Sequence, residues 1–451
     1  MKYLKFLFYF LIFQKLNSQQ IINYNQIFNW TNDTLVGSYV YDNIYNEIWG
    51  GEINDIEFAV IGSTAGTHIF DISEPENSSE IFFFPGSHNG PHVIHRDYHD
   101  YNGFLYTVCD EGNGSLQVID IRNLPYSANI IYDSDEFIKR AHNIFIDEVS
   151  NKLYACSVRN GQNQSSSIVI LDINNPFLPL KIMDYEIPET SYSAHDIWVN
   201  NDTGFVNNGY DGFFVINFSS ANPSIIGSLT SYPDKGYNHS GWPNSDMSLY
   251  VMADENWGYD LKILDISDLE NINVISTFNS EIHENSIAHN VMVKNNLAYI
   301  SYYHDGLQVY DISIPENPTK VGSFNSYLLD DHEETYRGAW GVYSFLPSNN
   351  ILISDMQFGL YVIGENYLNI EQIKNIDIRI FPNPSYSDIK IIFPNNQNIY
   401  YISLTNFLGK SIFNKKIKNK KNITISNLDK GIYNINIYNH SINMNKKLII
   451  Q

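Results

Sequence analysis

The chain contains 451 residues, 43% of them hydrophobic and 17% charged, with 27 lysine and arginine residues against 50 aspartate and glutamate residues. This apolar fraction excludes wholesale disorder. The net charge of −23 argues against nucleic acid as a partner, because such proteins neutralise phosphates with basic side chains. From Glu371 to the end there are 12 basic and 4 acidic residues, so this part carries +8 and residues 1–370 carry −31. The change of sign predicts a domain boundary.

The N-terminus is typical of a secretory signal peptide. Lys2 and Lys5 precede a short apolar run, residues 6–13, and a polar stretch reaches the small residue Ser18. A membrane span needs about 20 apolar residues, roughly twice this run. We therefore predict a signal peptide over residues 1–18 and a mature chain without a transmembrane segment.

A repeated unit fills residues 48–364. Its clearest part is a strand that ends in Asp-Ile or a variant, with successive copies 45 to 52 residues apart. The copies are Asp71-Ile72, Asp120-Ile121, Asp172-Ile173, Asn217-Phe218, Asp265-Ile266, Asp311-Ile312 and a degenerate Val362-Ile363-Gly364. Short period-2 runs bounded by Gly, Asn and Pro at this spacing predict four strands per unit. The pattern indicates an all-β fold, a seven-bladed β-propeller over residues 19–364, in which the Asp side chain closes a turn.

The closure of the ring is predicted from the outer strands. The seventh unit ends at Gly364 and runs into the linker, so it lacks an outer strand of its own. A similar Gly-Ser strand, residues 35–39, precedes the first unit. We predict that residues 35–39 complete the seventh blade, since closure hides exposed strand edges.

The opening strand of each blade would line the central channel. Four units carry a histidine between a small or polar residue and a polar one, and alignment of the flanking strands adds one residue from each remaining unit. The predicted ring consists of Asn46, Arg96, His142, His195, His239, His289 and Trp340.

Two interpretations of this ring are open. In the favoured one, each histidine hydrogen-bonds a backbone group of the adjacent blade, because repeat spacing alone explains four histidines at one register. In the other, His142, His195, His239 and His289 face a cavity with acidic side chains and bind either an anionic ligand or a metal, for which imidazole and carboxylate together favour a divalent transition metal. The acidic candidates are Asp110, Glu111, Asp254, Glu255, Asp305 and Asp355. Calcium at the acidic stretch 330–334 is a further possibility.

Neither the two cysteines nor any known catalytic motif indicates a particular reaction. Cys109 and Cys156 occupy similar strand contexts, so a disulfide between adjacent units and two buried thiols are both open. No Gly-x-Ser-x-Gly elbow, phosphate-binding Gly-rich loop or His-Glu-x-x-His is present.

These motifs together resemble the choice-of-anchor B family, which is built of LVIVD-type repeats. The resemblance is carried by Ala-His-Asn at the blade starts, by Leu307-Gln-Val-Tyr-Asp-Ile312 and by Tyr336-Arg-Gly-Ala-Trp340, and it covers about residues 33–364. Members are exported propellers with interchangeable surface-anchoring tails. The resemblance therefore implies fold and an extracellular or outer cell-surface location, and it implies no particular chemistry.

A second domain follows a linker at residues 365–373. Alternating strands and turns over residues 374–451 predict a small C-terminal β-sandwich. Phe381-Pro-Asn-Pro384, Asn406-Phe-Leu-Gly-Lys410 and Leu428-Asp-Lys-Gly-Ile-Tyr433 resemble the C-terminal sorting domain of the type IX secretion system of Bacteroidetes-like bacteria. The resemblance implies that the type IX machinery is a partner. The basic run 415–421 lacks stacking aromatics, which indicates a solvated hairpin and no nucleic-acid site.

The sequence thus leads to two functional hypotheses. The first is an exported binding or interaction module whose ligand is unknown, with a surface glycan or protein favoured by exposed aromatic side chains. The second is a metal-dependent extracellular enzyme, a hydrolase, that works at the histidine ring.

Overall fold

The computed structural model describes residues 22–329, 332, 334–365, 378–393, 399–406, 410–418, 420–439 and 442–451. The predicted signal peptide and almost all of the predicted linker lie outside the described residues. The chain forms two compact units, Met1–Asn366 and Tyr367–Gln451. In the described residues the regular elements are β-strands and two short 3-10 helices, η1 (Pro75–Asn77) and η2 (Leu269–Asn271), without an α-helix. The predicted all-β class is confirmed.

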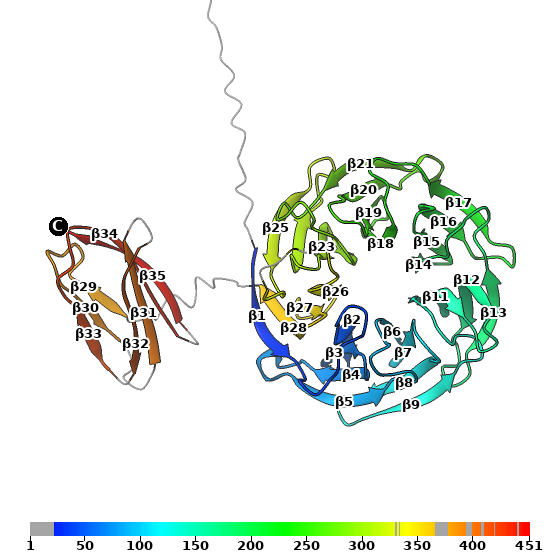
Figure 1. The fold of residues 1–451 in the computed structure, drawn as a ribbon, viewed down its shortest axis with the longest axis horizontal. Helices are drawn as coiled ribbons and strands as arrows, with labels where there is room; N and C mark the ends of the chain where they lie inside the picture. Colours follow the sequence, from blue (N-terminus) through cyan, green and yellow to red (C-terminus); the bar gives the residue numbers. More distant parts are fainter. Residues whose placement is uncertain are drawn as a thin grey trace, which may run out of the picture. The chain divides into compact units, whose positions relative to one another are not determined.

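Five four-stranded antiparallel sheets make up most of the first unit, and each is built from four consecutive strands. Figure 1 shows the sheets arranged in a circle, with first strands such as β2, β6, β14 and β18 toward the centre. Their strands are β2 (Tyr45–Ile53), β3 (Ile56–Ser63), β4 (Gly66–Asp71) and β5 (Ser79–Pro85); β6 (Arg96–Tyr101), β7 (Phe104–Cys109), β8 (Leu116–Asn123) and β9 (Ser127–Ser134); β10 (Asn143–Asp147), β11 (Lys152–Arg159), β12 (Ser165–Asp172) and β13 (Leu180–Tyr185); β14 (Asp196–Asn200), β15 (Thr203–Asn207), β16 (Phe213–Asn217) and β17 (Ser224–Leu229); and β18 (Asn238–Pro243), β19 (Leu249–Asp254), β20 (Leu261–Asp265) and β21 (Asn273–Phe278).

The sixth sheet has eight strands and joins the two ends of the first unit. Its order is β22 (Val291–Lys294), β23 (Leu297–Ser301), β24 (Leu307–Asp311), β25 (Thr319–Phe324), β1 (Ile22–Trp30), β28 (Gly359–Glu365), β27 (Ile351–Asp355) and β26 (Ala339–Tyr343). Strand β1 runs antiparallel to β28, from Tyr24 opposite Glu365 to Trp30 opposite Leu360. At Ile22 it also pairs in parallel with β25.

The prediction that residues 35–39 complete the last sheet is therefore wrong, because β1 occupies that edge. Residues 35–39 instead lie in a turn. The Ser38 amide donates to the Asn43 carbonyl at 2.9 Å, and Asp42 closes the turn with a positive φ of 53°. Asn and Asp tolerate this left-handed conformation, which interrupts an extended strand.

The repeated Asp-Ile strand ends have the predicted structural role. In each of the six clear copies the Asp or Asn side chain accepts a hydrogen bond from the backbone amide two residues later. The pairs are Asp71 with Ser73, Asp120 with Arg122, Asp172 with Asn174, Asn217 with Ser219, Asp265 with Ser267 and Asp311 with Ser313. These Asx turns lie at or near the end of the third strand of six four-stranded units, and only β8 continues past its turn, to Asn123.

The core of the first unit lies between neighbouring sheets. For example, Val118 of β8 and Ile144 of β10 belong to one buried apolar cluster, although they come from different sheets. Cys109 and Cys156 are both buried in such interfaces, and both are free. The disulfide interpretation is therefore wrong, and the two thiols act as small apolar side chains.

The C-terminal unit contains two sheets that share one apolar core. The three-stranded sheet contains β29 (Arg379–Phe381), β30 (Ile389–Ile392) and β33 (Asn422–Ile425), and the four-stranded sheet has the order β32 (Ser411–Lys418), β31 (Ile399–Asn406), β34 (Gly431–Asn439) and β35 (Ile442–Ile450). Ile391 and Leu404, one from each sheet, are fully buried in this core. The exposed lysines Lys415 and Lys416 lie on β32, an edge strand, where charge opposes edge-to-edge pairing.

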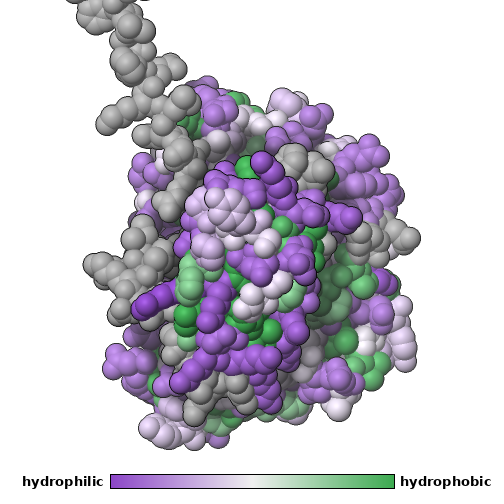
Figure 2. Space-filling view, turned by 90° about the vertical axis from the view of Figure 1, so that its left-hand side faces the viewer, coloured by the Kyte–Doolittle hydropathy of each residue, from purple (hydrophilic) through white to green (hydrophobic). Residues whose placement is uncertain are grey.

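The face of the molecule in Figure 2 mixes hydrophilic and hydrophobic side chains. Figure 2 shows a face on which hydrophilic side chains surround smaller groups of hydrophobic ones. Within the described part of the chain, no helix is both long and apolar enough to span a bilayer.

Candidate functional site

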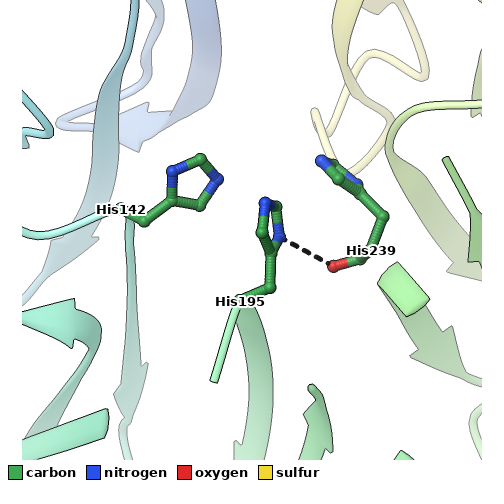
Figure 3. A group of neighbouring side chains, drawn as sticks. All are labelled: His142, His195 and His239. Atoms are coloured by element: carbon green, nitrogen blue, oxygen red, sulfur yellow. Dashed lines mark hydrogen bonds between the residues drawn. The ribbon is translucent and has the colours of Figure 1, made fainter. Parts of the chain in front are cut away.

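Five histidines and a tryptophan form a closed ring of aromatic side chains at the starts of the innermost strands. Neighbouring ring centroids lie 4.0–4.6 Å apart from His95 through His289 to Trp340, and the Trp340 and His95 centroids, at 5.4 Å, close the circle. Figure 3 shows His142, His195 and His239 projecting toward one another from neighbouring strands. The complete ring is His95, His142, His195, His239, His289 and Trp340.

The structure thus brings together the four predicted histidines and Trp340, but it places Arg96 elsewhere. The Arg96 guanidinium is buried, and it donates to the carbonyls of Ser63 at 2.8 Å and His88 at 2.6 Å. Arg96 lies opposite Cys109 in its hairpin, just as Asn143 lies opposite Cys156, so Arg96 is the equivalent of Asn143. The prediction for this position is therefore wrong by one residue. His95 is therefore the equivalent of His142.

Asn46 has a backbone-stitching role. Its side-chain amide is fully buried and donates to the Ile94 carbonyl at 3.1 Å. The next residue, Glu47, lines the cavity in the ring and the cavity beneath it instead. A β-bulge between Tyr45 and Ile48 produces this arrangement, since it places two residues of β2, one of them extra, opposite one residue of β3.

Three ring histidines donate from Nδ1 to the backbone of the next sheet. His195 Nδ1 bonds the His239 carbonyl at 3.1 Å, His239 Nδ1 bonds the His289 carbonyl at 3.2 Å, and His289 Nδ1 bonds the Trp340 carbonyl at 2.5 Å. A carbonyl can only accept, so Nδ1 carries the hydrogen in all three. The neutral imidazole then presents an unprotonated Nε2, the atom with which histidine binds metals.

These three histidines are held in the neutral form. Burial, followed by the neighbouring histidines, lowers the pKa of His195 and of His239 well below the usual value. Burial also lowers the pKa of His289 well below that value, although its bond to the Trp340 carbonyl acts in the opposite direction. At neutral pH the ring therefore contains at least three imidazoles that are free of an added proton.

His142 differs because it faces a carboxylate. Its Nδ1 lies 2.8 Å from Asp110 Oδ2. Burial alone would lower the pKa of His142, but the hydrogen bond and charge of Asp110 outweigh burial and raise that pKa. His95 stacks on His142 and donates from Nε2 to the His142 carbonyl at 2.7 Å. Burial lowers the pKa of His95 to about 3, and its Nδ1 has no hydrogen-bond partner in the described residues.

A second carboxylate, Glu255, completes the donor set. Glu255 Oε2 lies 3.7 Å from His239 Nε2, and its Oε1 accepts a hydrogen bond from the Tyr303 hydroxyl at 2.6 Å. Burial raises the pKa of Glu255 to about 7. Two groups of donor atoms lie within 4.8 Å of one another, namely His142–His195–His239 and His239–Glu255–His289. His239 belongs to both groups.

The other acidic candidates are engaged elsewhere. Asp254 pairs with Lys262 at 2.8 Å, and Asp305 pairs with His332 at 2.9 Å. Asp355 accepts from two backbone amides and Ser326, and Glu111 accepts from the amides of residues 94 and 95. Of the predicted calcium stretch, residues 330, 331 and 333 lie outside the described residues.

A layer of carboxylates lies directly beneath the ring. A cavity of about 10 Å³ in the ring and a cavity of about 60 Å³ below it share Glu47, Asn143, Asp196 and Asn290 as walls. Burial raises the pKa of Glu47 to about 7 and that of Asp196 to about 6, and it raises that of Asp97 well above its usual value. His95 and Glu47 were both missed by the sequence prediction.

We expect Glu47→Gln to change how stability depends on pH. The pKa of Glu47 is about 7 in the folded protein and 4.5 in the unfolded chain, so the folded state holds this proton at higher pH than the unfolded state does. The free energy of unfolding of the wild type therefore falls as pH rises from 4.5 to 7. Glutamine lacks this loss. The stability of the variant relative to the wild type should therefore increase by up to about 3 kcal/mol between pH 4.5 and pH 8, measured by urea unfolding. Glu52→Gln, at an exposed position of the same strand, is the control. If the free energy of unfolding depended on pH in the same way in Glu47→Gln and in wild type, the raised pKa of Glu47 would be contradicted.

Residues 379–451 match the family described as the secretion system C-terminal sorting domain. The match indicates a secreted, surface-targeted protein. It also implies handling by a type IX secretion system. Among curated proteins, none matches the chain.

Proposed function

We propose that this protein is an exported, surface-displayed seven-bladed propeller that binds a divalent transition metal at its histidine ring. In this proposal the eight-stranded sheet counts as two blades, β22–β25 and β26–β28 completed by β1, each as large as the other five sheets. The resemblance of residues 33–364 to the choice-of-anchor B family supports the blade count. The signal peptide over residues 1–18, the propeller over 19–364 and a β-sandwich over 374–451 belong to the same proposal.

The metal site rests on one observation, the arrangement of the two nitrogens in each ring. Nδ1 of His195, His239 and His289 is fixed by a backbone carbonyl, which leaves three neutral Nε2 atoms without another hydrogen bond among the described residues. Metal-binding histidines almost always donate their other ring N–H in this way. The backbone stitching and the metal site are therefore two uses of the same side chains.

The donor chemistry favours a transition metal. Imidazole nitrogens with one carboxylate suit zinc, iron, copper or nickel, whereas calcium prefers oxygen ligands. The cavity of about 10 Å³ between the histidines has room for a single water-sized species. His142, His195, His239, His289 and Glu255 would hold the ion.

A metal-dependent hydrolase is the second candidate, and the position of Glu255 favours it. A bound divalent metal supplies a Lewis acid. Glu255 lies beside the donor nitrogens, and the Tyr303 hydroxyl orients one of its oxygens. In this candidate the four histidines hold the metal, and the other oxygen of Glu255 is free to accept a proton from a substrate or water. A surface glycan or protein as ligand stays a prediction.

We expect the full chain to bind about one equivalent of Zn²⁺ or Co²⁺ after loading and dialysis. His239→Gln should weaken binding by more than about 100-fold, because His239 belongs to both donor groups and loss of a mere second-shell partner already costs 10–100-fold. His68→Gln, which changes a buried histidine in β4, is the matched control.

The pH dependence has a definite sign. Glu255 must lose a proton at a pKa of about 7, and His142 must lose the proton that Asp110 favours. Affinity should therefore rise from pH 6 to pH 8, by up to about tenfold per pH unit for each proton released. Wild-type protein that retains no metal at pH 8 would contradict the proposal.

A further inference from the structure

A second cavity lies at the opposite end of the inner strands from the histidine ring. The strands that start at the ring carry large side chains three residues further on, among them Phe145, Trp242 and Tyr343, and Trp49 lies at the matching place in β2. A cavity of about 380 Å³ opens among them. It is lined by Trp49, His99, Asp100, Phe145, Glu148, Trp242, Tyr343, Phe345 and five other residues. The 60 Å³ cavity beneath the histidine ring shares Trp49, Phe145 and Trp242 with this larger cavity. The larger cavity is therefore separated from the histidine ring by the layer of carboxylates that lines the 60 Å³ cavity.

Three aromatic pairs of this lining meet at steep angles, whereas Trp242 with Phe345 at 32° and Trp49 with His99 at 36° are closer to parallel. Trp49 and Tyr343 lie 5.1 Å apart at 60°, Phe145 and Trp242 lie 5.8 Å apart at 65°, and Tyr343 and Phe345 lie 5.9 Å apart at 77°. The lining therefore surrounds a compact ligand with aromatic rings in several orientations. A flat platform, on which a sugar ring stacks, would need one broad exposed face instead.

The charge of the lining is negative. Asp100, Asp147 and Glu148 contribute carboxylates, and the lining contains no lysine or arginine in the described residues. His99 adds no charge at neutral pH, because burial lowers its pKa to about 4. Asp100 accepts the Trp49 indole N–H at 2.8 Å, which fixes one wall against an acidic group.

We propose that this aromatic cavity binds a small organic cation of the quaternary or alkylated ammonium class. Aromatic faces attract such cations through the ring quadrupole, and partial enclosure strengthens the attraction. The volume falls in the range of small-molecule sites. Glu148, exposed beside the cavity, supplies the counter-charge at its edge. The inference is independent of the metal site.

The polar groups of the lining favour a cation over a saccharide. A sugar needs several free donors and acceptors, but the Trp49 N–H is already bound to Asp100. The Asp147 carboxylate already accepts four hydrogen bonds, from the amides of residues 149, 201 and 202 and from the Ser150 hydroxyl. The lining still offers aromatic surface and negative charge, together with three neutral polar side chains, Asn200, His99 and Tyr343.

The test compares choline with 3,3-dimethylbutan-1-ol, its neutral isostere, by calorimetry on full-length protein dialysed against EDTA. We expect choline to bind at least about tenfold more tightly than the isostere, since only the cation interacts with the ring faces and carboxylates. Glucose and cellobiose serve as the saccharide probes. Equal affinity for choline and the isostere, saccharide binding without choline binding, or no binding of any probe would each overturn the proposal.

Three variants assign the effect to this cavity. Trp242→Leu should weaken choline binding at least about tenfold, and Glu148→Gln, at an exposed position that does not endanger folding, about threefold. Trp198→Leu is the matched control, because Trp198 lies 6.2 Å from Trp242 but does not line the cavity. An effect of Trp198→Leu as large as that of Trp242→Leu would also contradict the assignment.

Discussion

Deletion of residues 22–30 is expected to destabilise the first unit by about 5 kcal/mol or more and to abolish its cooperative unfolding. Strand β1 covers the edge of β28, and its side chains Tyr24, Phe28 and Trp30 pack on the apolar cluster there. Burial of each such side chain contributes about 1.5–3 kcal/mol. The indole of Trp30 also lies 4.9 Å from the Phe70 side chain of the first sheet, measured between ring centroids. Strand β1 therefore connects the last sheet of the circle to the first.

Thermal and urea unfolding of chains that begin at residue 19 or at residue 31 measure this effect. Removal of residues 378–451 is the control, because those residues belong to a separate compact unit. Their removal should leave the melting temperature of the first unit unchanged. A synthetic peptide of residues 22–30 should restore part of the lost stability by pairing with the free edge. An unchanged melting temperature without β1 would contradict the closure described here.

Lys262→Met is the second large effect that we expect, at a cost of about 3–5 kcal/mol in unfolding free energy. The side chains of Lys262 and Asp254 are both fully buried and meet at 2.8 Å. Lys262 also donates to the Asp234 carbonyl at 2.9 Å. Removal of the lysine leaves the Asp254 carboxylate buried without its counter-charge, which is far more costly than the net contribution of the intact pair.

The double variant Lys262→Met, Asp254→Asn should recover part of this loss, since the uncompensated charge is gone. Lys181→Met is the matched control: Lys181 and Asp184 form an ion pair of similar length, 2.6 Å, on the surface, where the expected cost is only about 0–1 kcal/mol. Equal costs for Lys262→Met and Lys181→Met would show that Asp254 is solvated or neutral.

The repeat pattern predicted much of the arrangement of the first unit, because each repeat has the same strand and turn sequence. The Asp-Ile ends mark Asx turns that depend only on neighbouring residues, so they could be assigned from sequence. The four histidines share one register for the same reason. Strand β1 could not be found in this way, because its partner Leu360 lies 330 residues after Trp30 and its sequence is rich in Asn and Gln.

The errors in the site have equally local causes. His95 was passed over for Arg96 because hairpin register, set by Arg96 opposite Cys109, is not visible in the sequence. The signal that could have identified it is the histidine itself, which precedes a polar residue as His142 does. Glu47 faces the channel through a β-bulge, and Asp254 turns to Lys262 while its neighbour Glu255 reaches His239. Such side-chain directions depend on tertiary structure.

X-ray absorption spectroscopy of the zinc-loaded full chain tests the central claim, the metal site in the histidine ring, most directly. The account predicts a first shell that contains three or more imidazole nitrogens at about 2.0–2.1 Å, together with the multiple scattering typical of histidine ligands. His239→Gln should lose this signature and His68→Gln should keep it. A shell made only of oxygen atoms, or a spectrum that is the same in wild type and His239→Gln, would contradict the account.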